Sequence, residues 1–355
     1  MSGNSRREGT LLDDLENRAV IGPVARFVRS NGGILVAFAM LFLMMSVSAE
    51  NFFSGANFLN VMRNVSTNAV LAMGVMMCLI LGGIDLTGGA MLALSGCLCV
   101  VGLSRWGLSI PQAITLGVLV GVVVGFINGW VIAYSGIHPF IVTLAMQSIC
   151  RGFAYLIAGG QPVTLYGRDD FSMIGNGFLW NIPLPVIYMA VALVLLALLL
   201  NKTRAGRHIY ATGGNELAAR FSGINIKRTK ILVWTLSGAF AAIAGIVLAA
   251  RMTSGQPAVG LGYETDAIAA SVVGGTSMYG GVGSVGGMVI GVFIIGIISN
   301  GLNLLHVNSY WQYVAKGLII LLAVYIDMVR KNRELSGGLR LPLKGGKGAP
   351  KVAEK

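Results

Sequence analysis

Charged side chains are scarce in this sequence. Asp, Glu, Lys and Arg make up 11% of its 355 residues, against about 25% in a typical soluble domain. Apolar residues make up 55%, and most of them occur in long runs with little charge. A helix of roughly 20 apolar residues crosses a bilayer. The composition therefore excludes an ordinary soluble protein and predicts an all-α, polytopic membrane bundle.

Reactive side chains are scarce as well. The sequence contains four cysteines and three histidines. The cysteines lie in apolar stretches without metal-ligand spacing, and each histidine lies in a different segment, so no metal or Ser–His constellation is indicated. No Gly-x-x-x-x-Gly-Lys-Ser/Thr loop is present to cradle the phosphates of ATP. We therefore expect neither an enzyme nor a metal or cofactor site in this chain.

The basic residues gather in three places. Twenty of the 26 Lys and Arg residues lie in residues 1–30, 201–230 and 329–355. Because basic residues stay preferentially on the cytoplasmic side, both ends and one central loop are predicted to be cytoplasmic. The net charge of +12 then reflects loops against an anionic leaflet, and it does not indicate nucleic-acid binding. The predicted organisation is a cytoplasmic segment 1–30, a transmembrane domain 31–328 and a disordered basic tail 329–355.

Ten apolar stretches are candidates for membrane spans. An even number of crossings returns the chain to the side where it began, in agreement with the charge at both ends. The longest segment expected on the outer side is 160–181, and the stretch 265–278 is short for a full crossing. The candidate spans are 31–49, 64–83, 87–104, 109–134, 139–159, 182–200, 231–250, 265–278, 284–303 and 310–327.

Glycine, at 50 of 355 residues, is about twice as frequent as its usual share of roughly 7%. Two glycine-rich stretches look alike: residues 79–90 read LILGGIDLTGGA and residues 272–283 read VVGGTSMYGGVG. Short, Gly-interrupted segments in corresponding places of two halves are typical of a transport site, and a pair of ordinary tight turns is the alternative. We expect Asp85 and Thr87 to cap the helix that follows them. The predicted hairpin motif comprises Gly83, Asp85, Thr87, Gly274 and Gly275.

The central basic loop, residues 202–230, contains helix signals of its own. Asn215 is a good N-cap, Glu216 complements the helix dipole in the first turn, and Gly223 suits a left-handed C-terminal cap. The short amphipathic helix between them either rests on the membrane interface or docks into the groove of a partner protein. Its two-turn length and small residues favour docking, because such a helix buries little apolar area in lipid.

Five stretches taken together carry a more specific signal. They read GGIDLTGGAMLALSG (82–96), HPFIVTLAMQSICRG (138–152), TRAGRHIYATGGNELAARFSGINI (203–226), YETDAIAASVVGGTSMYGGVGSVGG (263–287) and NGLNLLHVNSYWQYVAKGLIILLAVYID (300–327). In this order the chain resembles, from about residue 31 to 330, the permease subunit of bacterial ABC importers for monosaccharides of the ribose/galactose type. That family usually has Ser where this chain has Thr87, and the hydroxyl is kept.

The resemblance implies partners and a location. It implies a homodimer in the bacterial inner membrane, an ABC ATPase subunit with tandem ATP-binding domains that binds the ATP, and a periplasmic sugar-binding protein. It also places the ATPase contact in the central loop. The residues implied for this contact are Gly206, Arg207, Gly214, Asn215, Ala218, Ala219, Arg220 and Gly223.

Three other functions are weighed against a sugar permease. An ABC permease for branched-chain amino acids shares the broad architecture. A proton-coupled secondary transporter needs titratable groups in relay, and Asp85, His138 and Asp266 are the residues available. An intramembrane aspartyl protease needs Asp85 and Asp266 to share a proton, but the predicted topology puts Asp85 near the inner end of its span and Asp266 near the outer end of its own.

The substrate path is predicted from polar residues inside the spans. An ionised side chain at the centre of a membrane helix costs on the order of 3 kcal/mol, so the few charges there are expected to pair. Arg151 and Asp266 are predicted at similar depth, and Arg151 is therefore expected to pair with Asp266 or Glu264. The candidate path residues are Asn128, Thr143, Gln147, Arg151, Asp266, Thr276, Asn300 and Asn303.

Overall fold

The computed structural model describes residues 22–337 and consists almost entirely of helices, which confirms the predicted all-α class. Each of the ten predicted spans overlaps one helix. These helices are α2 (Gly22–Ser48), α3 (Gly55–Ile80), α4 (Gly88–Ser104), α5 (Ile110–Ser135), α6 (Pro139–Ala158), α8 (Leu184–Lys202), α11 (Ile226–Met252), α12 (Tyr263–Val273), α13 (Val285–Leu304) and α14 (Ser309–Gly337). The shorter elements are β1 (Val163–Thr164), α7 (Asp169–Asn176), β2 (Phe178–Leu179), β3 (Ile182–Pro183), α9 (Arg204–Gly214), α10 (Glu216–Phe221) and β4 (Ser254–Gly255).

Seven of the described helices are long and apolar enough to cross a membrane. The helix α12 is not among them, because its 11 residues rise about 16 Å, roughly half of a 30 Å hydrocarbon core. The predicted span 265–278 is therefore wrong at its end: the helix stops at Val273. Gly275, with φ +88°, then turns the chain in a conformation that favours glycine.

The two ends of the described chain are more helical than the sequence indicated. The helix α2 begins at Gly22 instead of near residue 31, and α14 continues to Gly337. Residues 329–337 therefore belong to a helix and not to a disordered tail. The other parts of the two predicted terminal segments, residues 1–21 and 338–355, lie outside the described residues.

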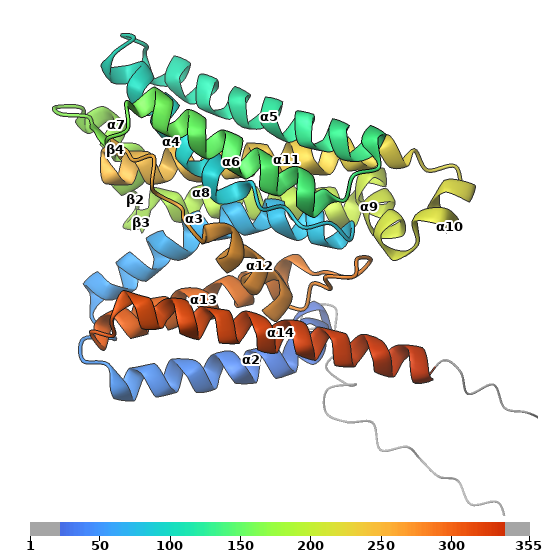
Figure 1. The fold of residues 1–355 in the computed structure, drawn as a ribbon. Helices are drawn as coiled ribbons and strands as arrows, with labels where there is room; N and C mark the ends of the chain where they lie inside the picture. The colour runs from blue at the N-terminus through green and yellow to red at the C-terminus, as the bar shows by residue number, and fades with distance from the viewer. Residues whose placement is uncertain (1–21, 338–355) are drawn as a thin grey trace, which may run out of the picture.

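The helices form two groups, and α4 lies at the centre of the larger one. It is apolar all round, as expected for a fully enclosed helix, and every residue from Gly88 to Leu103 is buried. It packs against α5, α6 and α11. Figure 1 shows α12 and α13 between this group and the outer pair α2 and α14, with contacts from α12 and α13 to α3 joining the two parts.

The segment predicted as the longest outer loop, 160–181, is folded onto the bundle. Its helix α7 inserts Phe171, which is fully buried, into an apolar cluster with Leu103 and Ile246. Strand β1 pairs antiparallel with β4, which ties the loop to the end of α11. This loop lacks a core of its own, as expected, and shares the core of the spans.

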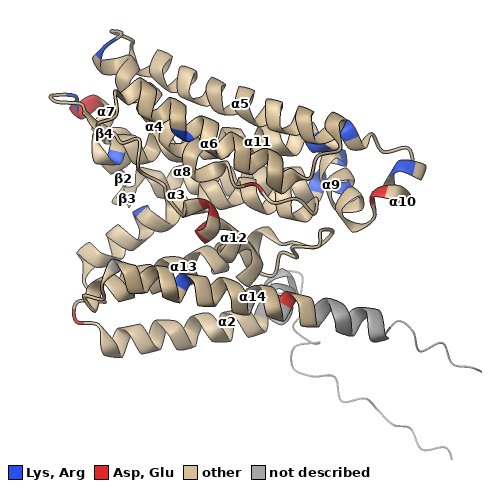
Figure 2. Ribbon diagram, viewed as in Figure 1, with Lys and Arg blue, Asp and Glu red and all other residues tan. Residues whose placement is uncertain are grey.

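Charged residues lie mainly at the two ends of the helix bundle, with few between them (Figure 2). One end carries α9 and α10 and the other carries α7 and the short strands (Figure 1). This is the distribution expected when the middle of the bundle faces hydrocarbon, where an ionised side chain is costly.

Close contact between α5 and α11 depends on small residues. A Cβ at Gly121 would approach Ala242 and the carbonyl oxygen of Gly238 to 2.5 Å, and a Cβ at Gly125 would overlap the carbonyl oxygen of Trp234. Glycines four residues apart on α5 therefore let the two backbones touch, as small residues do at membrane helix interfaces.

Replacing Gly121 by valine should destabilise the protein because the added methyl groups have no space. Overpacking of this kind costs about 1–3 kcal/mol or more, which should lower the thermal unfolding midpoint in detergent by several degrees. The matched control is Gly152→Val on α6, where a Cβ meets no described atom within 4 Å. Equal midpoints for the two variants would contradict this account of the α5–α11 contact.

Candidate functional site

The first glycine-interrupted turn, between α3 and α4, is organised around a buried carboxylate. Asp85 is 3% exposed. Its Oδ1 accepts a hydrogen bond from the backbone N–H of Thr87 at 2.9 Å, and its Oδ2 accepts from the hydroxyl of Ser237 on α11 at 2.7 Å. Asp85 thus stabilises the turn just before α4 by binding the N–H of Thr87, and not by a bond to an N–H inside the helix, as the predicted cap requires. The Thr87 side chain makes no capping bond to the helix.

Two predicted path residues support this turn. Asn128 on α5 donates from Nδ2 to the Thr87 hydroxyl at 3.0 Å, and the Thr143 hydroxyl on α6 donates to the carbonyl oxygen of Ile84 at 3.1 Å. Asn128 is 1% exposed and Thr143 is fully buried. Both residues therefore stabilise the turn by hydrogen bonds from the neighbouring helices α5 and α6.

The second glycine-interrupted turn, between α12 and α13, has a carboxylate in the corresponding role. Asp327 on α14 accepts from the backbone N–H of Met278 at 3.1 Å and from the Ser277 hydroxyl at 3.3 Å. The predicted path residue Thr276 is buried in this turn. A Cβ at Gly274 would overlap the carbonyl oxygen of Gly287, so a bare backbone is required where α12 meets α13.

The two turns touch each other, and α9 covers the point of contact. The backbone N–H of Gly281 donates to the carbonyl oxygen of Ile80 at 2.8 Å. A Cβ at Gly213, in the last turn of α9, would overlap that same oxygen. The hydroxyl of Tyr210 on α9 donates to the carbonyl oxygen of Gly283 at 2.9 Å, and burial raises the pKa of this hydroxyl above its ordinary value. We call this contact of Ile80, Gly213 and Gly281 the glycine junction.

The short helix predicted in the central loop is present as α10. The Asn215 side chain accepts from the N–H of Ala218 at 2.9 Å. At the other end the N–H groups of Gly223 and Ile224 bond back to the carbonyl oxygens of Arg220 and Ala219, the pattern that a left-handed glycine permits. Gly223 has φ +82°. The predicted caps are both confirmed.

One face of α10 is apolar and exposed. Leu217 is 66% exposed and Phe221 is 90% exposed, and residues four apart on a helix lie side by side. Ala219 is buried against the protein, and Gly206 is buried where α8 meets α9, with no space for a Cβ. Both residues are among those implied for the ATPase contact. Because they are buried, they hold α9 and α10 in place and do not form the exposed surface that an ATPase could contact.

A polar cluster joins α6 to the segment before α12. Arg151 donates from Nη1 to the carbonyl oxygens of Pro257 and Val259, at 2.6 and 2.7 Å. Gln147, one turn earlier, donates to Glu264 Oε1 at 3.1 Å. The other oxygen of Glu264 lies against Gly89, where a Cβ would overlap it, at the start of α4, where the helix dipole favours negative charge.

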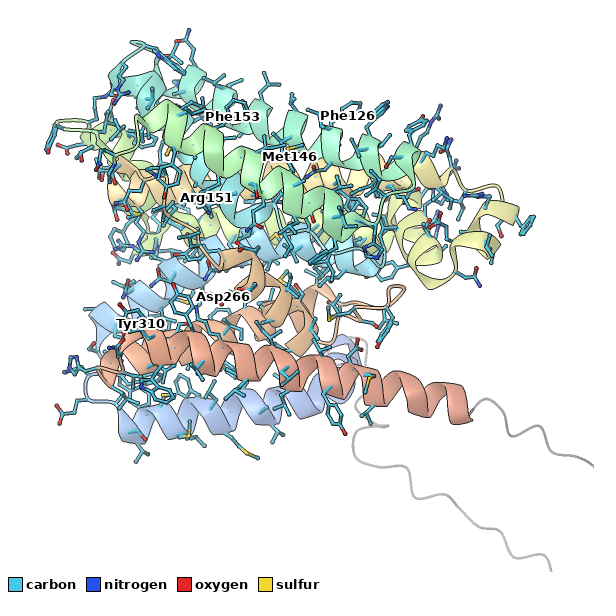
Figure 3. All side chains as sticks on the ribbon, viewed as in Figure 1. Phe126, Met146, Arg151, Phe153, Asp266 and Tyr310 are labelled. Carbon is cyan, nitrogen blue, oxygen red and sulfur yellow. The ribbon has the colours of Figure 1, made fainter. Side chains whose placement is uncertain are left out.

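Asp266 is paired with a residue other than the one predicted. Its Oδ2 accepts from Lys316 Nζ on α14 at 2.7 Å, so the prediction that Arg151 pairs with Asp266 is wrong. Among the described residues no ion pair joins Arg151 to Glu264, the alternative partner, either. Figure 3 shows Arg151 on α6, Asp266 on α12 and Tyr310 at the start of α14. One guanidinium nitrogen of Arg151, Nη1, donates to backbone carbonyls, and the Asp266 carboxylate binds the neighbouring helix α14 instead.

Two further predicted path residues join helices near the end of α13. Asn300 and Asn57 on α3 exchange side-chain hydrogen bonds at 2.8 and 3.2 Å. Asn303 Oδ1 accepts from Gln312 Nε2 on α14 at 2.8 Å. These amide pairs hold α13 to its neighbours.

The predicted path residues therefore fall into five separate places: the first turn, the second turn, the polar cluster of α6 with the segment before α12, the Asp266–Lys316 pair between α12 and α14, and the end of α13. Sequence reasoning missed Ser237, Asp327 and Lys316 as partners. The sequence does indicate Lys316 and Asp327, because they are a basic and an acidic residue within an otherwise uncharged final span. Ser237 had none, because it is one hydroxyl among many in the spans.

Known proteins resemble the chain over most of its length. A family model described as branched-chain amino acid transport system / permease component matches residues 57–324. The chain is 45% identical over 296 residues to the ribose import permease protein RbsC of Bacillus subtilis (strain 168), covering 83% of this chain and 92% of that protein. It is 40% identical to the L-arabinose transport system permease protein AraH of Escherichia coli (strain K12), covering 84% and 90%. It is 36% identical to the xylose transport system permease protein XylH of Haemophilus influenzae, covering 84% and 96%. No solved structure matches the chain.

Reversing the charges of Asp266 and Lys316 tests their pairing. Each single reversal, Asp266→Lys or Lys316→Asp, leaves two like charges together and should cost roughly 3 kcal/mol, the low end for breaking a buried ion pair, since the Lys316 side chain keeps 24% of its surface exposed. The double variant should recover most of the lost thermal stability in detergent.

The swap that the sequence indicated serves as the control. Arg151→Asp combined with Asp266→Arg should remain at least as unstable as either single change, because those two side chains bind different groups. Recovery in this pair, without recovery in the Asp266–Lys316 pair, would contradict the assignment.

Proposed function

We propose that this chain, which belongs to the family of sugar permease subunits of ABC importers, forms the translocation path for a monosaccharide such as ribose. In this proposal a periplasmic binding protein delivers the sugar and a separate ATPase subunit supplies the energy. The chain itself is a transport subunit and not an enzyme.

The observation that carries the proposal is the agreement among relatives. Those named for ribose, arabinose and xylose are 36–45% identical to this chain and each covers more than 80% of it. The family model is described by branched-chain amino acids, the substrate class that the sequence left as an alternative. Pentose permeases at such identity over nearly the whole chain favour a sugar.

The orientation rests on the basic residues. The end of the bundle that carries α9 and α10 includes the central basic loop, and basic residues favour the cytoplasm. We place this end in the cytoplasm, the end with α7 in the periplasm, and the chain in the bacterial inner membrane with both termini inside. The ATPase subunit and the periplasmic binding protein then dock at opposite ends of the bundle.

The coupling helix of this proposal is α10. Its exposed pair Leu217 and Phe221 offers an apolar contact suited to a groove of the ATPase subunit. Lys230 on α11 binds Glu216 at 2.9 Å and joins α10 to α11, while Arg220, within α10 itself, lies 3.7 Å from the same carboxylate. The glycine junction lies directly behind, so movement of α10 and α9 would reach both broken turns.

A second copy of the chain completes the proposed path. The resemblance to the sugar permeases supports a homodimer, and the ATPase subunit is expected to carry tandem ATP-binding domains, one for each permease. Exposed apolar side chains of α5 and α6, among them Phe126 and Phe153, offer surface for lipid or for the second copy.

Uptake of labelled sugars tests the substrate class. Cells that lack their own pentose and galactose importers and express this chain with its ATPase and binding protein should take up at least one of ribose, arabinose, xylose and galactose. Uptake should stop when the ATPase cannot hydrolyse ATP. Uptake of leucine, isoleucine or valine in place of every sugar would contradict the proposal.

Replacing Leu217 and Phe221 by serine should disconnect the permease from the ATPase. The pair contributes little to the fold because both side chains are exposed, so the variant should insert and remain stable. Burying one such side chain is worth about 1.5–3 kcal/mol, and loss of both should lower co-purification of the ATPase at least tenfold. Trp180→Ser, which alters an 89% exposed side chain at the other end, should leave co-purification unchanged. Equal retention of the ATPase by both variants would exclude docking at α10.

A further inference from the structure

A pocket with an ion pair in its mainly apolar wall lies between α12 and α14. Its cavity is about 420 Å³, within the roughly 300–1,000 Å³ typical of small-molecule sites. Its lining from α12 is Tyr263, Thr265 and Asp266, its lining from α14 is Gln312, Tyr313, Lys316, Gly317 and Ile320, and Leu261 and Gly262 complete it. The pocket is on the half of the bundle away from α9 and α10, because Asp266 is near the start of α12 and Lys316 near the start of α14.

The charges in this pocket cancel. Asp266 and Lys316 form one ion pair at 2.7 Å, and no other acidic or basic residue lines the cavity among the described residues. The pair uses one ammonium donor and one carboxylate oxygen, which leaves two N–H groups and the second oxygen for a ligand. A neutral ligand that both donates and accepts hydrogen bonds fits this arrangement better than an ion.

The other walls suit a sugar ring. Tyr313 is 62% exposed, and the negative face of its ring can meet the weakly positive C–H face of a pyranose or furanose. The amide of Gln312 is fixed in orientation by its bond to Asn303. Gly317 contributes no side chain to the pocket, and a Cβ at this position would meet no described atom within 4 Å. The pocket therefore has free space beside Gly317.

Polar lining at this depth needs a polar occupant. Gln312 and Lys316 belong to a helix long and apolar enough to cross the membrane, and intramembrane ionisable residues generally face a protein interior or a water-filled cavity, not lipid. A pocket with this ion pair in its wall can therefore hold water or a polar molecule.

We propose that the pocket formed by Asp266, Lys316, Tyr313 and Gly317 is a contact subsite for a monosaccharide on the outer half of the path. This inference rests on the proposed sugar-import function and adds the place where the sugar is met. Asp266–Lys316 binds adjacent hydroxyls, Tyr313 stacks on the ring, and Gly317 leaves the space that the ring occupies. The site binds weakly, since tight binding would prevent release.

A size series at Gly317 tests the site without disturbing the packing. Gly317→Ala, Gly317→Val and Gly317→Leu add progressively more bulk at a position that lines the cavity and where a Cβ meets no described atom within 4 Å. Added methylenes in a binding pocket change rates by about 10-fold or more, so initial uptake of labelled ribose, arabinose or xylose should fall in that order, by at least 10-fold for leucine. Leu318→Phe adds bulk to the adjacent, 62% exposed position on the same helix, outside the pocket, and should leave uptake unchanged.

Tyr313 provides a readout that a purely structural role would not move. Tyr313→Leu should change the ratio of ribose to xylose uptake, because the two sugars present different faces to the ring, and Tyr313→Phe should restore the ratio of the unaltered protein. ATP hydrolysis stimulated by the sugar-loaded binding protein should persist in all of these variants in the reconstituted complex.

Three results would overturn the subsite. One is unaltered uptake with Gly317→Leu, and another is a constant sugar ratio across the Tyr313 variants. The third is parallel loss of uptake and ATP hydrolysis in Gly317→Leu and Leu318→Phe. If the unaltered complex takes up none of the sugars, the proposed function itself fails, and this outcome is distinct because no variant is needed to see it.

Discussion

Two interruptions of helix inside the bundle expose backbone N–H groups that a bilayer cannot satisfy, and the structure depends on how these groups are bound. Each unsatisfied group in an apolar medium costs several kcal/mol. In the first turn Asp85 accepts from the N–H of Thr87. In the second turn Asp327, from a different helix, accepts from the N–H of Met278. Both breaks are therefore tolerated because a carboxylate is brought to them.

Glycine lets the two turns become one structural unit. The bond from Gly281 to Ile80 and the close approach of Gly213 to the same oxygen require backbones without side chains at the junction. The last turn of α9 thereby rests on both breaks, and α10 follows α9 after a single residue, Asn215. Two backbone contacts at Ile80 therefore connect the two buried turns with α9, and α9 leads directly to the surface helix α10.

The charged side chains within the bundle bind whichever polar group the packing brings next to them. Sequence reasoning placed Arg151 and Asp266 at similar depth in the membrane and predicted from depth alone that they pair. In the structure the loop between β4 and α12 brings the carbonyl oxygens of Pro257 and Val259 to Arg151, and α14 brings Lys316 to Asp266. Depth follows from counting residues along a helix, whereas facing depends on packing between helices.

The sequence by itself determined the membrane location, the ten helical stretches, the caps of α10 and the importer family. These follow from apolar run length, basic-residue bias, local backbone hydrogen bonding and motifs, all of which act over a few turns of chain. Tertiary structure alone decided that α12 is only about half as long as a membrane crossing and that segment 160–181 packs onto the bundle through Phe171. It also decided that Asn128 and Thr143 stabilise the turn before α4, and that Lys316 is the partner of Asp266. Those outcomes depend on which helix faces meet, and an apolar, glycine-rich helix such as α4 is nearly uniform around its axis, so its sequence does not specify a face.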